Sequence, residues 1–338
     1  MLDKTSPASR VYQCERSALS FQQSAEQENT ENFAHLLTRV RTPNLKEGGL
    51  MRNLTEANLT DAVLTKLEGA PSPRFRQVMS SVITHLHACI REVELTEAEW
   101  FAAIQFLTAV GKKCEDKRQE FILLSDTLGA SMLVDAITHR TPAGATESTV
   151  LGPFHVPGAP ELGNGANVAA GFPGEPALFS GHVLTMEGKP IAGAQLDVWQ
   201  ADAEGLYDVQ RSNLNGKQLR GKIRTDEQGR FWFWTVRPTA YPVPTDGPVG
   251  QMLFNMGRHP YRPAHIHAIV TAPGYESVTT HVFAEGDPYL DSDAVFGVKD
   301  SLVVKFVRQD PGTAPDGTVM KQPYYTVSYD FGLPAVQS

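Results

Sequence analysis

Residues 265–271 read HIHAIVT, one of several short stretches in the second half of the chain that decide the fold. Each is rich in β-branched and aromatic residues, as strands are, and Gly and Pro are dense between them. Many short strands joined by such turns predict a sandwich or a barrel rather than a parallel α/β sheet. The other stretches are AQLDVWQ (194–200), RFWFWTV (230–236), SVTTHVF (277–283), LVVKFV (302–307) and YYTVSYDF (324–331).

The chain over residues 54–140 has a different pattern, in which apolar residues recur at intervals of three and four. This spacing predicts a helix over residues 73–93. Thr96 and Glu99 have the spacing of a capping box for the helix that follows. Residues 120–138 are apolar on most faces, so we expect them to form one buried helix.

At roughly 150 residues per domain, a chain of 338 residues is expected to form about two domains. The patterns above indicate two such regions, preceded by an N-terminal segment of different composition. Residues 1–50 are rich in Gln, Glu, Asn, Ser and Thr, which predicts a disordered extension or a start codon placed too far upstream. Residues 51–143 are expected to form a helical region and residues 144–338 an antiparallel β-sandwich. The fold class is therefore predicted to be α+β.

Composition excludes several function classes. Lys and Arg number 30 against 38 Asp and Glu, and a net charge of −8 argues against binding to nucleic acid or to an anionic membrane surface. No apolar run reaches the roughly 18 residues that span a bilayer, and the N-terminus does not resemble a signal peptide. Cys14, Cys89 and Cys114 are widely spaced, which indicates a reduced, cytoplasmic environment rather than a disulfide framework.

The strongest local signal for chemistry is RPAHIHA, which contains a His-x-His pair. Alternate side chains share a face of a strand, so His265 and His267 can bind one metal ion. The residues alone leave the completing ligand open. Glu276 or Glu285 would give a site with two His and one carboxylate, and His281 would give three imidazoles, as in zinc sites.

Two tyrosines offer another way to complete the site. Tyr207 and Tyr241 each follow a strand-like stretch, at a position where loops gather into sites. A phenol has a pKa of about 10, and only a strongly Lewis-acidic ion such as Fe³⁺ readily holds it as phenolate near neutral pH. By spacing alone, strand-end aromatic rings with hydroxyls in water are the better interpretation.

Several long motifs occur in an order that resembles the intradiol ring-cleaving dioxygenases, the catechol 1,2-dioxygenase group. The resemblance covers about residues 51–335 and implies one Fe³⁺ per subunit, held by Tyr207, Tyr241, His265 and His267. It also implies a cytoplasmic homodimer built through the N-terminal helices, where phospholipid sometimes occupies a tunnel. The motifs are TESTVLGPFHVPGAP (146–160), DVWQADAEGLYDV (197–209), the loop around Tyr241, RPAHIH and TTHVFAEGDPYLDSD (279–293).

Other segments are similar to the branch of this family that acts on hydroxyquinol, benzene-1,2,4-triol. The similarity implies cleavage of this triol by O₂ to 3-hydroxy-cis,cis-muconate, which tautomerises to maleylacetate, in the catabolism of aromatic compounds. The segments are LLSDTLG (123–129), VLGPF (150–154), YPVPTDGP (241–248) and DSDAVFGVKDSL (291–302).

The resemblance also implies roles for individual residues. Tyr241 takes a proton from the substrate, and Arg262 stabilises negative charge that develops on it, unless Arg262 only forms a structural ion pair. The implied substrate pocket consists of Leu123, Asp126, Val150, Leu151, Gly152, Pro153, Phe154, Val243, Pro244, Arg262 and Val295.

The sequence leaves alternative roles open for two residues, and it leaves alternative functions open for the protein. Asp126 contacts the extra hydroxyl of the triol or forms a hydrogen bond at a helix end or loop. His281 stands where many catechol enzymes have Gln, and it either donates a hydrogen bond beside the metal ligands or simply packs. The alternative functions are cleavage of catechol or chlorocatechol, a zinc hydrolase that uses His265, His267 and His281, and a non-catalytic transthyretin-like binding sandwich.

Overall fold

The structure is a computed structural model that describes residues 52–115, 118–140, 142–211 and 217–336. The predicted extension over residues 1–50 lies outside this part of the chain. The chain divides into two compact units between Gln105 and Phe106, and each unit is described by itself.

The first unit is helical in its described part. It contains α2 (Leu59–Thr65), α3 (Pro73–Glu92) and the beginning of α4 (Glu97–Lys113). The predicted capping box is confirmed, because Glu99 accepts a hydrogen bond from the Thr96 amide at 2.9 Å and donates its own amide to the Thr96 hydroxyl at 3.3 Å.

The second unit contains the rest of α4, three further α-helices and all described strands. The single helix predicted for residues 120–138 is wrong: α5 (Glu120–Thr127) and α6 (Ala130–Thr138) are separated at Gly129, whose φ of 75° is left-handed. Both helices also expose apolar side chains, among them Phe121 and Leu133, so the expectation of full burial is wrong as well. No single described helix is long and apolar enough to cross a bilayer, and α5 and α6 meet that test only as a pair bent by 77°.

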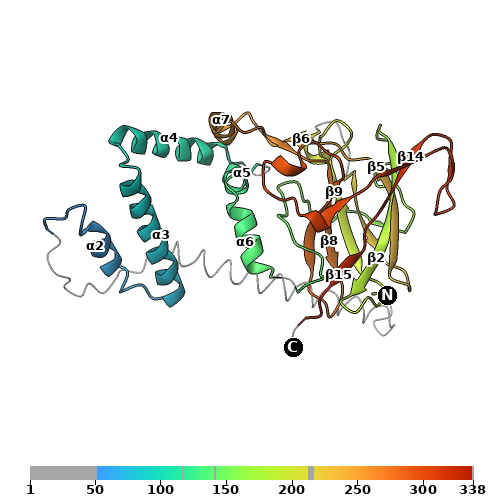
Figure 1. The fold of residues 1–338 in the computed structure, drawn as a ribbon, viewed down its shortest axis with the longest axis horizontal. Helices are drawn as coiled ribbons and strands as arrows, with labels where there is room; N and C mark the ends of the chain where they lie inside the picture. The colour runs from blue at the N-terminus through green and yellow to red at the C-terminus, as the bar shows by residue number, and fades with distance from the viewer. Residues whose placement is uncertain (1–51, 116–117, 141, 212–216, 337–338) are drawn as a thin grey trace, which may run out of the picture. The chain divides into compact units, whose positions relative to one another are not determined.

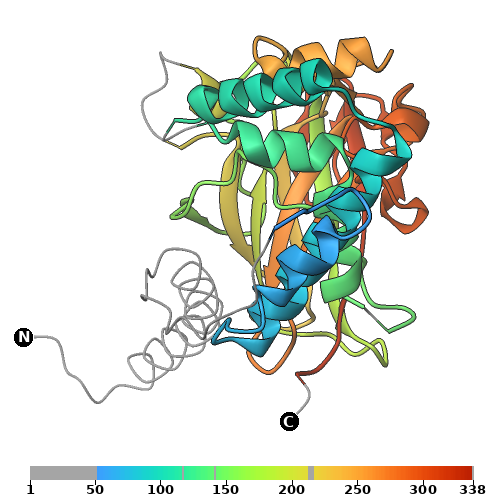
Figure 2. The same cartoon turned by 90° about the vertical axis from the view of Figure 1, so that its left-hand side faces the viewer.

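The strands form two principal sheets (Figures 1 and 2). The six-stranded sheet has the order β1-β4-β3-β8-β9-β10, and the five-stranded sheet has the order β11-β14-β2-β15, with β5 paired to β2. The bounds in the first sheet are β1 Glu161–Leu162, β3 Gln195–Trp199, β4 Arg220–Arg224, β8 His265–Thr271, β9 Val278–Ala284 and β10 Val303–Val304. Those in the second are β2 Pro176–Thr185, β5 Arg230–Val236, β11 Val307–Gln309, β14 Tyr324–Ser328 and β15 Phe331–Leu333.

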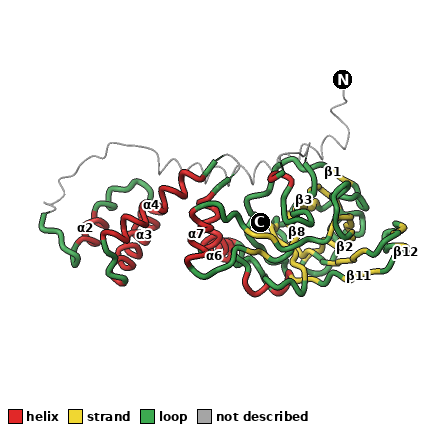
Figure 3. The backbone as a smooth tube through the Cα atoms, turned by 90° about the horizontal axis from the view of Figure 1, so that it is seen from above, coloured by secondary structure: helices red, strands yellow, loops and turns green. Residues whose placement is uncertain are grey.

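Shorter elements complete this unit, and long loops connect the strands (Figure 3). The strand pairs β6/β7 and β12/β13 lie outside the two principal sheets. The bounds are β6 Tyr241–Pro242, β7 Tyr261–Arg262, β12 Gly312–Thr313, β13 Val319–Met320 and α7 Pro248–Asn255, with single 3₁₀ turns at Asp208–Gln210, Leu290–Ser292 and Asp300–Leu302.

A continuous apolar core holds the two sheets together. Phe179 of β2 and Phe233 of β5 pack in the same buried cluster as Val198 of β3 and Ile266 of β8. The predicted class of N-terminal helices followed by a sandwich is therefore confirmed. The sheets are not purely antiparallel, because β2 pairs in parallel with β14 and β15, and β1 and β10 are parallel to their neighbours.

Candidate metal centre

Four potential ligands reach one place from three segments of the second unit. His265 and His267 alternate along β8, so both side chains lie on one face of this strand. Tyr207 follows β3, which pairs with β8, and Tyr241 begins β6. All four residues are buried, with no more than 5% of their surface exposed.

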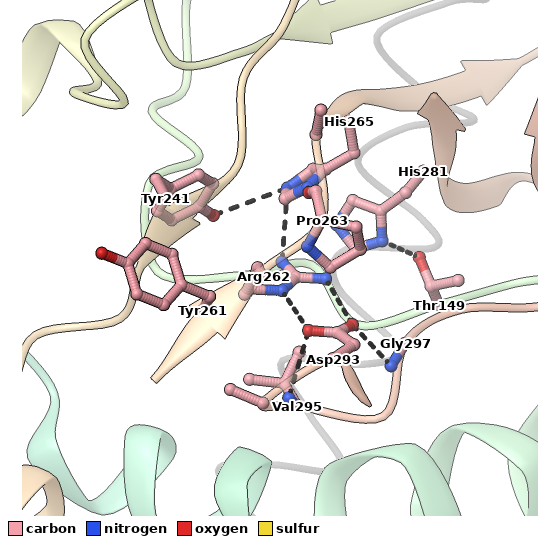
Figure 4. Close-up of polar contacts among 12 residues, drawn as sticks. Thr149, Tyr241, Tyr261, Arg262, Pro263, His265, His281, Asp293, Val295 and Gly297 are labelled. Atoms are coloured by element: carbon pink, nitrogen blue, oxygen red, sulfur yellow. Dashed lines mark hydrogen bonds and ion pairs between the residues drawn. The ribbon is translucent and has the colours of Figure 1, made fainter. Parts of the chain in front are cut away.

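The donor atoms of these side chains converge. The hydroxyl of Tyr207 lies 2.8 Å from Nε2 of His267 and 3.1 Å from the hydroxyl of Tyr241. Nε2 of His265 lies 3.2 Å from Nε2 of His267 and 3.5 Å from the Tyr241 hydroxyl, a contact visible in Figure 4. Two oxygen and two nitrogen donors therefore surround a single point.

The electrostatics of these groups fit a strongly Lewis-acidic metal ion. Burial lowers the pKa of His265 to about 3, so its imidazole is neutral and its Nε2 can offer a lone pair. Its Nδ1 donates to the carbonyl of Pro263 at 2.7 Å, which fixes this orientation. Burial raises the pKa of both Tyr207 and Tyr241, so the phenolates need a strong positive charge beside them.

Aromatic rings hold two of these ligands in place. The indole of Trp199 stacks on the imidazole of His267, with centroids 4.5 Å apart and planes at 14°. The ring of Phe154 stacks on Tyr207, with centroids 4.4 Å apart. Phe154 was predicted as a pocket residue, whereas Trp199 was not assigned to the site. The place of Trp199 at the end of β3, in register with His267, is the signal that could have identified it.

A buried ion pair that the sequence analysis missed lies behind Tyr207. Asp208 accepts a hydrogen bond from Nε of Arg220 at 2.7 Å, and both side chains are almost fully buried. Arg220 also donates to the carbonyl of Phe154 at 3.3 Å. This pair therefore connects the segment that bears Tyr207 with the segment that bears Phe154.

Arg262 lies beside the converging donors. Its Nη1 is 3.4 Å from Nε2 of His265, and its Nε pairs with Asp293 at 3.1 Å (Figure 4). Asp293 also accepts the amides of Gly297 and Val295. Although burial works against ionisation of Asp293, the guanidinium of Arg262 holds the pKa of this carboxyl below its ordinary value.

The predicted pocket residues occupy different environments. Leu123, Val243 and Val295 pack in one buried apolar cluster, against which Val150 also packs. Two further groups complete the set: Gly152 and Phe154 lie against His267 and Tyr207, whereas Leu151 and Pro153 are exposed and Pro244 is half-buried.

Asp126 of α5 is buried with 5% of its surface exposed. Burial is the largest influence on its carboxyl and raises its pKa, while a hydrogen bond from Ser131 and the charge of Arg262 act in the opposite direction. Asp126 is therefore close enough to Arg262 for the charge of the guanidinium to lower the pKa of its carboxyl.

The third candidate imidazole, His281, is fully buried on β9. Nitrogen atoms of His265, His267 and His281 lie within 4.8 Å of one another. Glu276 and Glu285 are both exposed and are not part of this group, so the site with two His and one carboxylate receives no support among the described residues.

Comparison with known proteins identifies the family. A family model described as "Dioxygenase" matches residues 150–334, and one described as "Catechol dioxygenase N terminus" matches residues 72–146. The chain therefore belongs to the intradiol ring-cleavage dioxygenases, enzymes that use iron. The alternative of a non-catalytic binding sandwich is not retained.

Relatives with the same architecture are numerous. The chain is 52% identical to the 6-chlorohydroxyquinol 1,2-dioxygenase of Cupriavidus pinatubonensis over 84% of this chain and 99% of that protein. It is 50% identical to the hydroxyquinol 1,2-dioxygenase of a Rhizobium species over 82% of this chain and 95% of that protein. The crystal structure of hydroxyquinol 1,2-dioxygenase from Pseudomonas putida matches with a TM-score of 0.79 and 51% identity, over 83% of this chain and 99% of that one.

Proposed function

We propose that this enzyme cleaves hydroxyquinol between its two adjacent hydroxyl groups, with O₂, to 3-hydroxy-cis,cis-muconate, which tautomerises to maleylacetate. The observation that carries this proposal is the convergence of two phenols and two imidazoles, with the Tyr207 hydroxyl 2.8 Å from Nε2 of His267. Relatives of about 50% identity that bear the hydroxyquinol name support the choice of substrate.

The proposed metal is one Fe³⁺ per subunit, with Tyr207, Tyr241, His265 and His267 as its ligands. Ferric iron supplies the Lewis acidity that binds an aromatic diol and makes a ring carbon reactive towards O₂. Two tyrosinates and one hydroxide balance its charge, which suits a buried site. The exposed fraction of Tyr207 is 0%, so its oxygen is shielded from bulk water.

Proton transfer is assigned to Tyr241. A diol loses two protons when it binds as a dianion, and the hydroxide can accept only one of them. The Tyr241 oxygen would accept the other proton and become a neutral phenol, a role that the family resemblance assigns to this residue. Tyr207 would remain a phenolate, so that the net charge of the loaded site would stay at zero.

Arg262 is assigned to stabilise negative charge on the substrate. Its guanidinium is buried beside His265 and is oriented by Asp293, so it needs no reorganisation when charge develops. Asp126 is proposed to accept a hydrogen bond from the third hydroxyl of the triol, while Leu123, Val243 and Val295 form the apolar wall of the pocket.

Oxygen uptake tests this function. The purified enzyme is expected to consume one O₂ per benzene-1,2,4-triol and to form a product with the ultraviolet spectrum of maleylacetate. A higher kcat/KM for catechol or a chlorocatechol would move the enzyme to the alternative substrate class. Zinc in place of iron in elemental analysis, with no oxygen uptake, would contradict the proposal.

The proposal also covers assembly and location. Apolar side chains exposed on α3 and α4 support a homodimer through these helices, and the family resemblance supports phospholipid bound between them. They include Val82, Leu86, Ile90, Trp100, Phe101 and Ile104. Light scattering and lipid extraction would test both points. A cytoplasmic location is supported by three cysteines that form no CxxC pair.

A further inference from the structure

Two buried nitrogen atoms beside the metal centre have no hydrogen-bond partner among the described residues. They are Nδ1 of His267 and Nε2 of His281. The two residues stand opposite each other in the register of β8 and β9, and their ring centroids are only 4.1 Å apart. Buried polar atoms in folded proteins almost always have a partner, so this pair of unpartnered atoms calls for an explanation.

The chemistry of His267 determines the role of its free nitrogen. Its Nε2 points at the phenolic oxygen of Tyr207 and is the atom that would bind the metal. A neutral imidazole that offers Nε2 as a ligand must carry its proton on Nδ1. Nδ1 of His267 is therefore a buried donor, and it needs an acceptor. His265 satisfies the same need through the carbonyl of Pro263.

His281 can supply that acceptor in only one of its two neutral tautomers. Its Nδ1 lies 2.5 Å from the hydroxyl of Thr149, which can donate or accept (Figure 4). With the proton on Nδ1, His281 donates to Thr149, and its Nε2 becomes an acceptor. With the proton on Nε2, two buried donors would be left unsatisfied side by side.

Other neighbours are poorer acceptors. Nε1 of Trp199, which is also unpartnered, can only donate. Nε2 of His155 lies 3.5 Å from the carboxylate of Asp197, to which it can donate. Among the described residues with unpartnered buried atoms, this leaves His281.

We propose that His281 is a positioning residue that accepts a hydrogen bond from Nδ1–H of His267, with Thr149 holding His281 in the required tautomer. The proposal rests on the proposed metal centre and explains why an imidazole so close to the ligands is not itself a ligand. The two rings lie edge to face at 64°, with their centroids 4.1 Å apart. Such a bond orients the ligand and makes its Nε2 a stronger donor to the metal.

Histidine tautomers in the metal-loaded protein test the proposal directly. Protein labelled with ¹⁵N-histidine and loaded with Ga³⁺, a diamagnetic trivalent ion, is examined by long-range ¹⁵N–¹H NMR. The expected result is a protonated Nδ1 on both His267 and His281, with a downfield, exchange-protected proton on His267. A proton on Nε2 of His281, or a metal ion bound to that atom, would overturn the proposal.

Variants provide a second readout in the affinity for iron and in the position of the tyrosinate-to-iron absorption band. His281→Leu should weaken iron binding about 10- to 100-fold and shift the band. His281→Gln, whose amide oxygen can accept the same hydrogen bond, should restore both to near the wild-type values, and Thr149→Val should lie between. Val282→Ala is the matched control, because Val282 lies next to His281 on β9 but packs in the apolar core.

The outcomes separate this proposal from the proposed function. Wild-type iron affinity and an unshifted band in His281→Leu would overturn the hydrogen bond and leave the enzyme's function intact. Failure of the wild-type chain to bind iron would overturn the metal centre, and the positioning role with it.

Discussion

The hydroxyl of Tyr207 lies 2.8 Å from Nε2 of His267, although the two residues are 60 positions apart in the chain. The antiparallel pairing of β3 and β8 accounts for this contact. It places Trp199, the last residue of β3, opposite His267, and the loop that follows returns Tyr207 to the same face. The candidate metal centre is thus a product of strand register, and it depends on the segments that support each of the four side chains.

Gly152→Ala should weaken iron binding about tenfold or more, because a Cβ atom there would lie 3.2 Å from Cε1 of His267. Titration of the metal-free protein with iron measures the effect. Gly188→Ala is the matched control: Gly188 has a φ of 74°, close to the 75° of Gly152, but no atom lies within 4 Å of its added Cβ. Equal iron affinity in the two variants would contradict the effect assigned to the contact with His267.

Arg220→Met should destabilise the protein by about 3–5 kcal/mol, because it leaves the carboxylate of Asp208 buried without its partner. Urea unfolding measures this loss. The comparison is Arg230→Met, which removes a pair with Asp226 in which the arginine is 54% exposed, and it should cost less than about 1 kcal/mol. Similar losses in both variants would contradict the role given to the buried pair.

Asp246→Asn should make the enzyme less stable at neutral pH and have less effect in acid. Hydrogen bonds from Lys113 and Arg118 lower the pKa of Asp246 to about 2. Because this pKa lies below that of an unfolded aspartate, about 3.9, the stabilisation is present above pH 4 and is lost as the pH falls towards 2.

The size of this effect is small, at most about 1 kcal/mol, since the Asp246 side chain is 64% exposed. The unfolding free energies of wild type and variant, compared at pH 6 and pH 3, should differ more at pH 6. Asp310→Asn is the control, because this carboxylate is 90% exposed and lies 3.6 Å from its partner Arg308. A difference in unfolding free energy between wild type and Asp246→Asn that is larger at pH 3 than at pH 6 would contradict the stabilising role of the Asp246 carboxylate.

Asp126→Asn should reduce kcat/KM for benzene-1,2,4-triol about tenfold, because a neutral amide oxygen accepts a weaker hydrogen bond than a carboxylate does. Catechol lacks the third hydroxyl and serves as the internal control, so its kcat/KM should change little. An equal loss for both substrates would assign Asp126 to the structure of α5 rather than to substrate recognition.

The strand that carries His265 and His267 was predictable from sequence, and so was β5. HIHAIVT corresponds to β8 and RFWFWTV to β5 without a shift. The longest strand, β2, was not predicted, because Pro176 and Gly181 are typical of turns. Gly181 is required there, since a Cβ atom would lie 1.8 Å from the carbonyl oxygen of Tyr329.

The supporting contacts could not be predicted in the same way. The pairing of Asp208 with Arg220 and the stacking of Trp199 on His267 depend on which strands are neighbours and in what register. The spacing of the residues along the chain holds no such information. The His-x-His pair was visible because both ligands lie on one strand, whereas the two tyrosines were assigned only through the resemblance.

The visible absorption spectrum of the iron-loaded enzyme, with elemental analysis, tests the central claim most directly. We predict one iron per chain and a red-brown colour from tyrosinate-to-iron charge transfer. Tyr241→Phe should alter this band and lower turnover about 10²- to 10⁴-fold. Tyr261→Phe should preserve both, since the Tyr261 hydroxyl points away from His265 (Figure 4). A colourless protein that contains iron, or one in which Tyr241→Phe leaves the band unchanged, would contradict the account.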